Sequence, residues 1–351
     1  MVKRFLIANS AFLILKEAMI FVTGGTGLVG AQLLFDLTKA GNRVRALKRD
    51  SSRMTVINRI FHGNENLLSR IEWVTGDVTD IFSLEDAMKD VKEIYHCAAL
   101  VSFVTSDFKS LLKTNVEGTA NMVNMAMECG VERFCYVSST AALGRSQENI
   151  FLDEKTAWKT SKYNSGYSIS KYGAEREVWR ATEEGLNAFI VNPSIILGPG
   201  EFHSGSTALF GQVWKGLKFY PTGSSGFVDV RDVTACMIGL MEKKANVERY
   251  VISAENTSYR NVINGIADSF GKKRPTILVG KTLTEIGWRA EKIRKLFSGG
   301  NAMITKETAR NGNHHWLYSN EKIKRALGFE FISLKDSIEW TCGIFLKEQN
   351  R

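Results

Sequence analysis

The chain of 351 residues contains only four prolines and no segment of strongly biased composition. The absence of such a segment argues against a disordered linker between folded parts. The five cysteines are odd in number and show no Cys-x-x-Cys spacing, which argues against a disulfide framework and a zinc ribbon. Most of them lie inside apolar runs, so we expect buried, reduced thiols in a cytoplasmic protein. They are Cys97, Cys129, Cys135, Cys236 and Cys342.

The amino-terminal end lacks an apolar run long enough to span a bilayer. Lys3 and Arg4 precede the apolar stretch Phe5–Leu15, but Lys16 follows without the small-residue cleavage site of a signal peptide. A strand pattern then begins at once near Met19. We therefore expect residues 1–18 to be an extension that is not native, with Met19 as the true first residue. A peripheral membrane anchor is the alternative.

Acidic residues are scarce near the carboxyl end. Residues 271–325 hold 13 Lys and Arg against 4 Asp and Glu, an excess equal to the net charge of +9 of the whole chain. We expect a solvated basic surface there. An anionic substrate or weak contact with an anionic membrane surface would also suit it. Nucleic acid is not expected as a partner, because no recognition motif accompanies the charge.

Histidine is scarce as well, with five in the chain. The adjacent pair His314 and His315 lies in a polar stretch without carboxylates or thiolates at ligand spacing. We interpret it as a solvated loop and expect no metal site.

Strand and helix patterns alternate from Met19 to Pro193. The strand candidates are apolar without alternation, which is typical of strands buried on both faces of a parallel sheet. They are Ile20–Val22, Val44–Leu47, Ile71–Val74, Ile94–Cys97, Phe134–Val137 and Ala188–Val191. The helix candidates between them are Leu28–Ala40, Phe82–Met88, Phe108–Cys129 and Ser168–Glu184, and Gly41 and Gly130 stand where C-cap glycines are expected. The pattern predicts an α/β fold with a doubly wound parallel sheet.

After Pro193 the alternation weakens. We expect residues 19–195 to form a nucleotide-binding domain, and residues 196–351 to complete the sheet and build a smaller substrate-binding lobe. Val230–Met241 predicts a helix and Arg249–Ser253 one more strand. Five aromatic side chains in this part could line an apolar pocket, although core packing is their more common role. They are Phe202, Phe210, Trp214, Phe219 and Tyr220.

A glycine-rich turn follows the first strand. Residues 23–30 read Thr-Gly-Gly-Thr-Gly-Leu-Val-Gly between a predicted strand and a predicted helix. Glycine lets the backbone approach a pyrophosphate, and the exposed N–H groups of a helix start attract its charge. In this position the pattern indicates a dinucleotide site of the Rossmann type. The residues concerned are Gly24, Gly25, Thr26, Gly27, Leu28 and Gly30.

The end of the second strand bears on the choice of cofactor. An acidic residue there would accept a hydrogen bond from the ribose of NAD, whereas bases suit the 2′-phosphate of NADP. Lys48 and Arg49 reach this position first, before Asp50. We therefore expect NADP(H) to be preferred, with NAD(H) as the alternative.

A Tyr-x-x-x-Lys motif lies on the fourth predicted helix. Tyr167 and Lys171 share one face of that helix, because residues four apart lie one above the other. An ammonium beside a phenol favours the phenolate and lowers its pKa from about 10 towards the range of a general acid and base. Ser138 and Ser139 follow the central predicted strand, so a hydroxyl lies at the sheet edge where ligands bind.

Together these motifs resemble the extended short-chain dehydrogenases/reductases, the NAD-dependent epimerase/dehydratase family, over residues 19 to 345. The resemblance includes Gly-Asp-Val-Thr-Asp at 76–80, His-Cys-Ala-Ala at 96–99, Asn-Val-Glu-Gly-Thr at 115–119, Asn-Pro-Ser-Ile-Ile-Leu-Gly-Pro-Gly at 192–200 and Phe-Val-Asp-Val-Arg-Asp-Val at 227–233. Leu100 departs from the pattern, since a glycine usually follows the two alanines.

The resemblance also implies roles. Ser139 would hydrogen-bond the substrate oxygen, Tyr167 would transfer the proton, and Lys171 would bind the nicotinamide ribose and tune the tyrosine. Asn115 would position a helix. The implied cofactor contacts are Asp77 and Val78 at the adenine, the small residues Cys97, Ala98 and Ala99, Pro193 and Ile196 beside the nicotinamide, and Tyr167 and Lys171 themselves.

The closest likeness is to the branch of dihydroflavonol reductases and 3β-hydroxysteroid dehydrogenases. It implies hydride transfer between the cofactor and a fairly apolar ketone or secondary alcohol, a small-molecule substrate. A nucleotide-sugar 4-epimerase or reductase is the first alternative, and a non-catalytic regulator that senses NADP(H) is the second. A homodimer through the helices that carry Asn121–Cys129 and Tyr167 is also compatible with the family.

Overall fold

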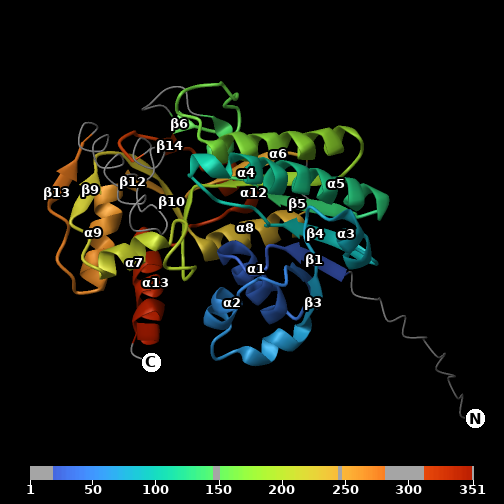
Figure 1. Cartoon of the computed structure of the whole chain (residues 1–351), viewed down its shortest axis with the longest axis horizontal. Coiled ribbons are helices and arrows are strands. Elements are labelled where there is room, and N and C mark those ends of the chain that lie inside the picture. Colours follow the sequence, from blue (N-terminus) through green and yellow to red (C-terminus); the bar gives the residue numbers. More distant parts are fainter. Residues whose placement is uncertain (1–18, 145–150, 244–246, 281–311, 350–351) are drawn as a thin grey trace, which may run out of the picture.

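Seven strands form one parallel sheet at the centre of the molecule (Figure 1). The computed structural model describes residues 19–144, 151–243, 247–280 and 312–349. The strand order is β3-β2-β1-β4-β5-β7-β11, and every neighbouring pair is parallel. The strands are β1 Met19–Thr23, β2 Val44–Lys48, β3 Ile71–Thr75, β4 Val91–His96, β5 Arg133–Val137, β7 Ala188–Pro193 and β11 Arg249–Ile252. The predicted fold and all seven predicted strands are confirmed.

Helices cover both faces of this sheet, because its central strands are apolar on both sides. One face packs against α1 (Leu28–Lys39), α2 (Thr55–Ile60), α8 (Val230–Glu242) and α12 (Glu321–Leu327). The other packs against α3 (Ile81–Ala87), α5 (Gly118–Glu128) and α6 (Gly166–Glu183), with α5 and α6 side by side (Figure 1). The short 3₁₀ segments are η1 Glu65–Arg70, η2 Thr105–Asp107 and η4 Thr140–Leu143.

The predicted helix from Phe108 to Cys129 is interrupted. It consists of α4 (Phe108–Leu111), a π-helical turn η3 (Leu112–Glu117) and α5. Turns of this kind are rare in proteins, and those that occur are often located at functional sites. The turn carries Asn115, which is buried and forms side-chain contacts described below. No periodicity argument separates one π turn from a continuous α-helix, so the sequence did not show it.

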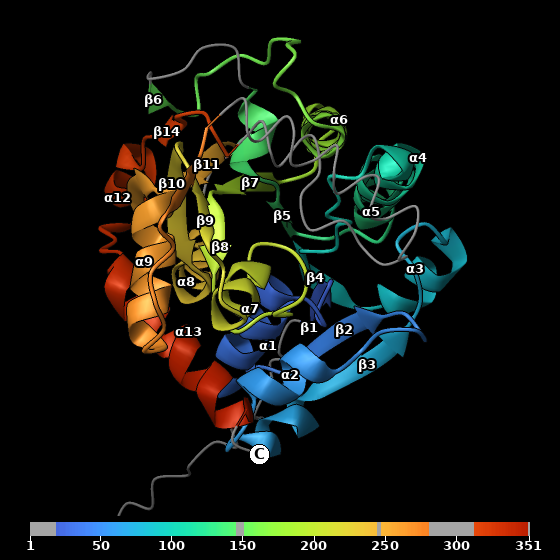
Figure 2. The ribbon, with the colours of Figure 1, turned by 60° about the vertical axis from the view of Figure 1, so that its left-hand side comes forward.

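A smaller lobe, most of which follows β7 in the chain, lies beside the sheet (Figure 2). It contains a sheet of β8 (Ile195–Leu197), β10 (Ser224–Asp229) and β12 (Glu255–Ser258), and the pair β9 (Phe219–Pro221) and β13 (Ile277–Val279). Its helices are α7 (Ala208–Trp214), α9 (Tyr259–Ser269) and α13 (Leu334–Gln349). A last strand pair joins β6 (Phe151–Leu152) to β14 (Leu317–Tyr318).

The core of this lobe contains most of the aromatic side chains for which the sequence allowed either pocket lining or core packing. Phe202 and Phe210 are buried, and the ring of Phe202 packs edge-on against Phe345 of α13 at 4.7 Å. Trp214 packs against Phe270 and Phe345 as well. Tyr220 is buried, whereas Phe219 is exposed. Core packing is therefore the role of all but Phe219.

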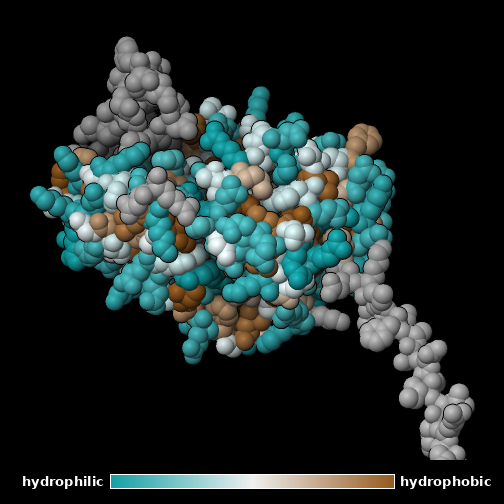
Figure 3. Space-filling model, turned by 90° about the horizontal axis from the view of Figure 1, so that it is seen from below, coloured by the Kyte–Doolittle hydropathy of each residue, from teal (hydrophilic) through white to brown (hydrophobic). Residues whose placement is uncertain are grey.

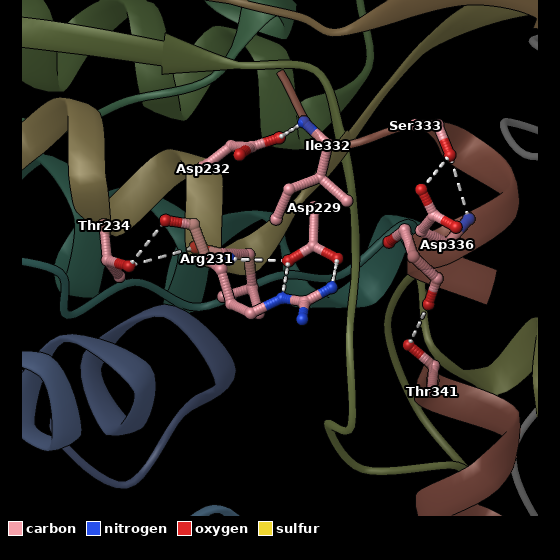
Figure 4. A network of polar contacts seen from close by, with 10 residues as sticks. Asp229, Arg231, Asp232, Thr234, Ile332, Ser333, Asp336 and Thr341 are labelled. Atoms are coloured by element: carbon pink, nitrogen blue, oxygen red, sulfur yellow. Dashed lines mark hydrogen bonds and ion pairs between the residues drawn. The ribbon is translucent and has the colours of Figure 1, made fainter. Parts of the chain in front are cut away.

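The start of α8 ties the two parts together (Figure 4). Asp229 caps this helix through the backbone N–H of Arg231 and forms an ion pair of 2.8 Å with the Arg231 guanidinium. That guanidinium also lies 3.8 Å from the ring centre of Trp340 in α13. Asp232 accepts a hydrogen bond of 3.0 Å from the backbone N–H of Ile332, just before α13. The helix that covers the sheet is thus bonded to the helix that closes the small lobe.

The surface seen in Figure 3 is mostly hydrophilic, with apolar residues interspersed. Within the described ranges, we find no helix with the length and apolar character needed to cross a membrane. Cys135, Cys236 and Cys342 are buried as expected, while Cys97 and Cys129 are half-buried, and all five thiols are free. Residues 1–18 and most of the basic segment, 281–311, lie outside the described residues.

Candidate active site

The glycine-rich turn joins β1 to α1 and is too close-packed for side chains. Gly24 has a positive φ of 69°, and a Cβ added there would lie 2.6 Å from the backbone nitrogen of Ala98. A Cβ on Gly30 would lie 2.2 Å from the carbonyl oxygen of Gly24. Gly27 caps α1 without a side-chain hydrogen bond, and it is exposed. The helix start is therefore open to an anionic group, which fits the pyrophosphate of a dinucleotide.

The residues flanking these glycines shape the same turn. Thr26 and Leu28 are half-buried, and Gly25 packs on Leu34 of α1, where a Cβ would lie 2.8 Å from a methyl carbon. The side chain of Leu28 contacts the turn at Gly198 and Gly200. The turn is thus packed between α1 and the start of the small lobe.

The basic residues expected to read the ribose lie at the carboxyl end of β2. Lys48 is the last residue of that strand and Arg49 is exposed just after it. Among the described residues, neither side chain has a hydrogen bond or an ion pair. Arg45, in contrast, is engaged elsewhere, with Glu72 at 2.9 Å and the carbonyl groups of Ala87 and Lys89. Two cations that have no partner within the described ranges therefore lie at the carboxyl end of β2.

Asp77 and Val78 follow β3 at the same edge. The Asp77 carboxylate accepts hydrogen bonds from the backbone and the hydroxyl of Thr79, at 2.9 and 2.8 Å, and so closes a turn. The Val78 side chain is buried against Gly118 of α5, and its carbonyl oxygen accepts from Asn121.

The loop after β4 is held to the helices behind it. The Asn115 amide bonds both the N–H and the carbonyl oxygen of Leu100, at 2.7 and 3.0 Å, and also donates to the hydroxyl of Ser170 in α6. Asn115 therefore fixes the loop that follows Cys97, Ala98 and Ala99, rather than a helix alone. These two hydrogen bonds use only the backbone of Leu100, so the departure from glycine leaves them intact.

Ser139 and Tyr167 meet at the carboxyl end of β5. The Ser139 hydroxyl accepts from the N–H of Ala141 at 3.1 Å, and it lies close enough to the Tyr167 hydroxyl to oppose a rise in the pKa of that phenol. Tyr167 is half-buried at the start of α6, with the ring of Phe103 5.7 Å away. Burial raises the pKa of Tyr167 to about 12, and the nearby Ser139 hydroxyl opposes this rise. The prediction of a net lowering of this pKa is therefore wrong, because burial dominates.

Lys171 lies one turn along α6, is buried, and faces β5. Its ammonium donates to the Tyr136 hydroxyl at 2.7 Å and to the Val137 carbonyl oxygen at 2.8 Å. Burial lowers the pKa of Lys171 to about 7, while the nearby Glu175 carboxylate raises it. An ammonium that is half-deprotonated near neutral pH is suited to proton chemistry.

Behind Lys171 runs a buried polar chain that the sequence did not indicate. The Tyr136 hydroxyl lies near Thr119, the Thr119 hydroxyl lies 3.1 Å from Nε2 of His96, and Nδ1 of His96 lies 2.7 Å from the hydroxyl of Thr23. Burial lowers the pKa of His96 to about 3, so the imidazole is neutral. The chain connects the lysine to the last residue before the glycine turn. The pairing of β1, β4 and β5 and the packing of α5 on the sheet bring these residues together.

Pro193 and Ile196 lie where β7 ends and β8 begins. Pro193 is buried at the end of β7, and Ile196 is half-buried and pairs with Val228 of β10. They stand at the edge of the sheet that carries Ser139 and the glycine turn.

The histidine pair is not in a solvated loop. His314 is buried, with its ring 4.9 Å from that of Tyr163, and Nδ1 of His315 lies 2.9 Å from the hydroxyl of Ser224. That interpretation was wrong because the polar stretch around the pair packs against β10. No cluster of three or more metal-ligating side chains occurs among the described residues.

The fold and this edge define a class. A glycine turn leads from the first central strand into a helix whose start is open to a phosphate, and serine, tyrosine and lysine lie at the carboxyl ends of the neighbouring strands. This is the arrangement of a dinucleotide-binding oxidoreductase of the short-chain type.

Comparison with known proteins narrows the class. The model of the NAD dependent epimerase/dehydratase family matches residues 20–253. The chain is 30% identical over 332 residues to a protein of Synechocystis sp. named "Putative dihydroflavonol 4-reductase", covering 91% of this chain and 93% of that protein. It is also 30% identical over 269 residues to sterol demethylase protein B of Methylococcus capsulatus, covering 75% and 78%.

A solved structure shows the same fold. The dTDP-glucose 4,6-dehydratase DesIV of Streptomyces venezuelae, with NAD bound, superposes with a TM-score of 0.76 at 18% identity, over 95% of this chain and 98% of that one. The chain belongs to the NAD-dependent epimerase/dehydratase family, within the extended short-chain dehydrogenases/reductases. It is a nicotinamide-dependent oxidoreductase.

Proposed function

We propose that the protein interconverts a fairly apolar ketone and its secondary alcohol with NADP(H), using Ser139, Tyr167 and Lys171. The observation that carries this proposal is the proximity of the Tyr167 and Ser139 hydroxyls at the sheet edge that also holds the glycine turn. A phenol and a hydroxyl in contact can both reach one substrate oxygen.

The cofactor would lie along that edge. The pyrophosphate would bind at the turn made by Gly24, Gly25, Thr26, Gly27, Leu28 and Gly30, where added Cβ atoms would collide. The adenine would contact Asp77 and Val78, Cys97, Ala98 and Ala99 would line the middle, and Pro193 and Ile196 would flank the nicotinamide. The cations of Lys48 and Arg49, which have no partner in the part of the chain that the structure describes, support a 2′-phosphate, and hence NADP over NAD.

The chain's own residues move the proton. The bound nicotinamide supplies or accepts the hydride at the carbon. In reduction, Tyr167 donates its phenolic proton to the carbonyl oxygen while the Ser139 hydroxyl hydrogen-bonds that oxygen. The Lys171 ammonium then favours the phenolate that remains, so it lowers the cost of the transfer. In oxidation the same groups act in reverse, with Tyr167 as the base.

The names of the relatives support the substrate class, since a dihydroflavonol and a sterol are both large and mainly apolar. We also place the protein in the cytoplasm and expect a homodimer through α5 and α6. Native mass spectrometry tests the oligomeric state and would show any nucleotide that copurifies.

The test is turnover with defined probes. Purified protein is incubated with NADPH and either dihydroquercetin or a 3-ketosteroid, and NADPH oxidation is followed at 340 nm. Parallel samples receive UDP-glucose without added cofactor. Reduction of a ketone supports the proposal. Formation of UDP-galactose with no ketone reduction would contradict it and favour the epimerase alternative, while tight NADPH binding without any turnover would favour the regulator.

A further inference from the structure

A second buried charge lies on the face of α6 that carries Lys171. Glu175 follows four residues later and is 1% exposed, so it lies one helical turn from the lysine on the same face of α6, close enough for its charge to act on the ammonium. A carboxylate this deeply buried costs free energy unless donors surround it. The Tyr-x-x-x-Lys motif does not require it.

Donors from two other strands satisfy the Glu175 carboxylate. The side-chain amide of Asn192, in β7, donates to Oε1 at 2.5 Å. The guanidinium of Arg249, in β11, lies 3.4 Å from Oε2 and is itself fixed by the carbonyl groups of Glu154 and Thr156, each at 2.8 Å. Burial raises the pKa of Glu175, but these donors act in the opposite direction and favour the ionised form.

The Asn192 amide connects Glu175 to the serine. Its Nδ2 also donates to the carbonyl oxygen of Ser139, at 3.0 Å. One amide group is therefore held by Glu175 on one side and holds the backbone of Ser139 on the other. Ser139 has to place its hydroxyl near Tyr167. The Glu175 carboxylate therefore helps to fix the position of that hydroxyl through Asn192.

Glu175 is also the anion that faces Lys171. The other titratable groups near the ammonium come from β4 and β5, and they are neutral near pH 7. Burial raises the pKa of Cys97 to about 12 and that of Tyr136 well above its usual range, and it lowers the pKa of His96 to about 3. Among the described residues, the lysine thus depends on Glu175 to keep its proton.

We propose that Glu175 is a positioning residue for this reaction, which favours the ammonium form of Lys171 and fixes Ser139 through Asn192. The inference rests on the proposed function for its catalytic consequence. The reaction needs the lysine in its ammonium form, so the rate of reduction falls as pH rises through the pKa of Lys171. Without the carboxylate that fall begins at lower pH.

The test has one readout that needs neither substrate nor cofactor. Protein labelled with ¹³C at lysine Cε is titrated by NMR, and Lys171 is assigned by its loss in Lys171→Arg. A lysine near pKa 7 stands apart from ordinary lysines near 10.4. In Glu175→Gln, which keeps the volume and an acceptor for Asn192, we expect the Lys171 titration to move down by about one pH unit or more. Glu177→Gln, which loses only a half-exposed pair with Arg180, is the matched control and should leave it unchanged.

Two further variants separate the roles. Arg249→Gln removes the cation that supports Glu175, so it should move the Lys171 titration in the same direction by less, and it serves if Glu175→Gln does not fold. Asn192→Ala keeps the carboxylate but removes one of its donors, so it should move the Lys171 titration less than Glu175→Gln does. Because it frees the Ser139 backbone, it should lower kcat about tenfold even at a pH at which Lys171 is fully protonated.

An unchanged Lys171 titration in folded Glu175→Gln would overturn the electrostatic role, and a wild-type kcat in Asn192→Ala would overturn the link to Ser139. These outcomes are distinct from a failure of the proposed function. If the proposed function is wrong, the wild type will turn over no ketone, while the NMR titration will still report on Glu175.

Discussion

The Lys171 ammonium and the Tyr136 hydroxyl are joined by a hydrogen bond of 2.7 Å inside the sheet, and the nitrogen lies 4.3 Å from the centre of the Tyr136 ring. The ammonium is thus held by β5, while the phenol of Tyr167 contacts Ser139. Tyr136 is therefore the protein group that orients the amine, and the polar chain through Thr119 and His96 orients Tyr136.

Tyr136→Phe removes this acceptor and leaves a buried ammonium short of one partner. A hydrogen bond to a charged group contributes about 1.5–3 kcal/mol, so we expect kcat to fall about tenfold or more. Tyr95→Phe is the control, because Tyr95 is equally buried but packs in the core on the opposite face of the sheet. Steady-state kinetics with NADPH and a ketone provide the measurement. Equal kcat for wild type and Tyr136→Phe would show that the contact is irrelevant to turnover.

Gly30→Ala tests the turn that would hold the pyrophosphate. The new Cβ would lie 2.2 Å from the Gly24 carbonyl oxygen, so the turn has to move. We expect NADPH affinity, measured by fluorescence titration, to fall about tenfold or more, since overpacking costs about 1–3 kcal/mol. Gly343→Ala, in α13, has open space around it and should stabilise the helix by about 0.5–1 kcal/mol without changing affinity. Wild-type affinity in Gly30→Ala would contradict a bound phosphate at this turn.

Some features of the fold and the site could be predicted from the sequence and others could not, depending on whether a local pattern specifies them. The strands were predictable because each is a short apolar run between turns, as at Phe134–Val137, where every residue is buried. Placement of Ser139 and Tyr167 at one edge followed from the direction of parallel strands. The π turn at Asn115, the buried state of His314 and the raised pKa of Tyr167 were not predictable, because each depends on contacts between segments far apart in the chain.

The same reason explains why Glu175, Asn192 and Arg249 were missed. They come from α6, β7 and β11, and no spacing in the sequence links them. The lysine's main partner was missed as well, because Tyr136 was interpreted only as one residue of a buried strand. Helix spacing correctly put Lys171 on the face of Tyr167, but it could not show that the ammonium bonds β5 instead.

Lys48→Ala combined with Arg49→Ala tests the cofactor preference. If the two cations bind a 2′-phosphate, the double variant should raise the KM for NADPH by about tenfold or more and leave that for NADH nearly unchanged. Arg43→Ala, just before β2 at its opposite end, is the control. A wild type that already prefers NADH, or a double variant that weakens both cofactors equally, would refute NADP specificity at this position.

Asp232 should make stability depend on pH. Burial raises its pKa from the usual range of about 3.9 to about 7, so the folded protein binds a proton that the unfolded chain releases. This contribution is fully present below about pH 4 and is lost as pH rises through 7. Relative to Asp232→Asn, which stays neutral, the wild type should therefore lose melting temperature between pH 4 and 8. If the difference in melting temperature between the two proteins stays the same across this pH range, the carboxyl group does not titrate as stated.

The most direct measurement of the central claim follows the hydride and the proton separately. NADPH with deuterium at both positions of C4 of the nicotinamide is incubated with a reducible ketone, and the alcohol is analysed by NMR, for the wild type, Tyr167→Phe and the helix control Tyr172→Phe. The account predicts deuterium on the carbinol carbon with the wild type and the control. It also predicts a rate about 10²–10⁴ lower in Tyr167→Phe, which still binds NADPH. Product without deuterium, or an undiminished rate without the phenol, would contradict it.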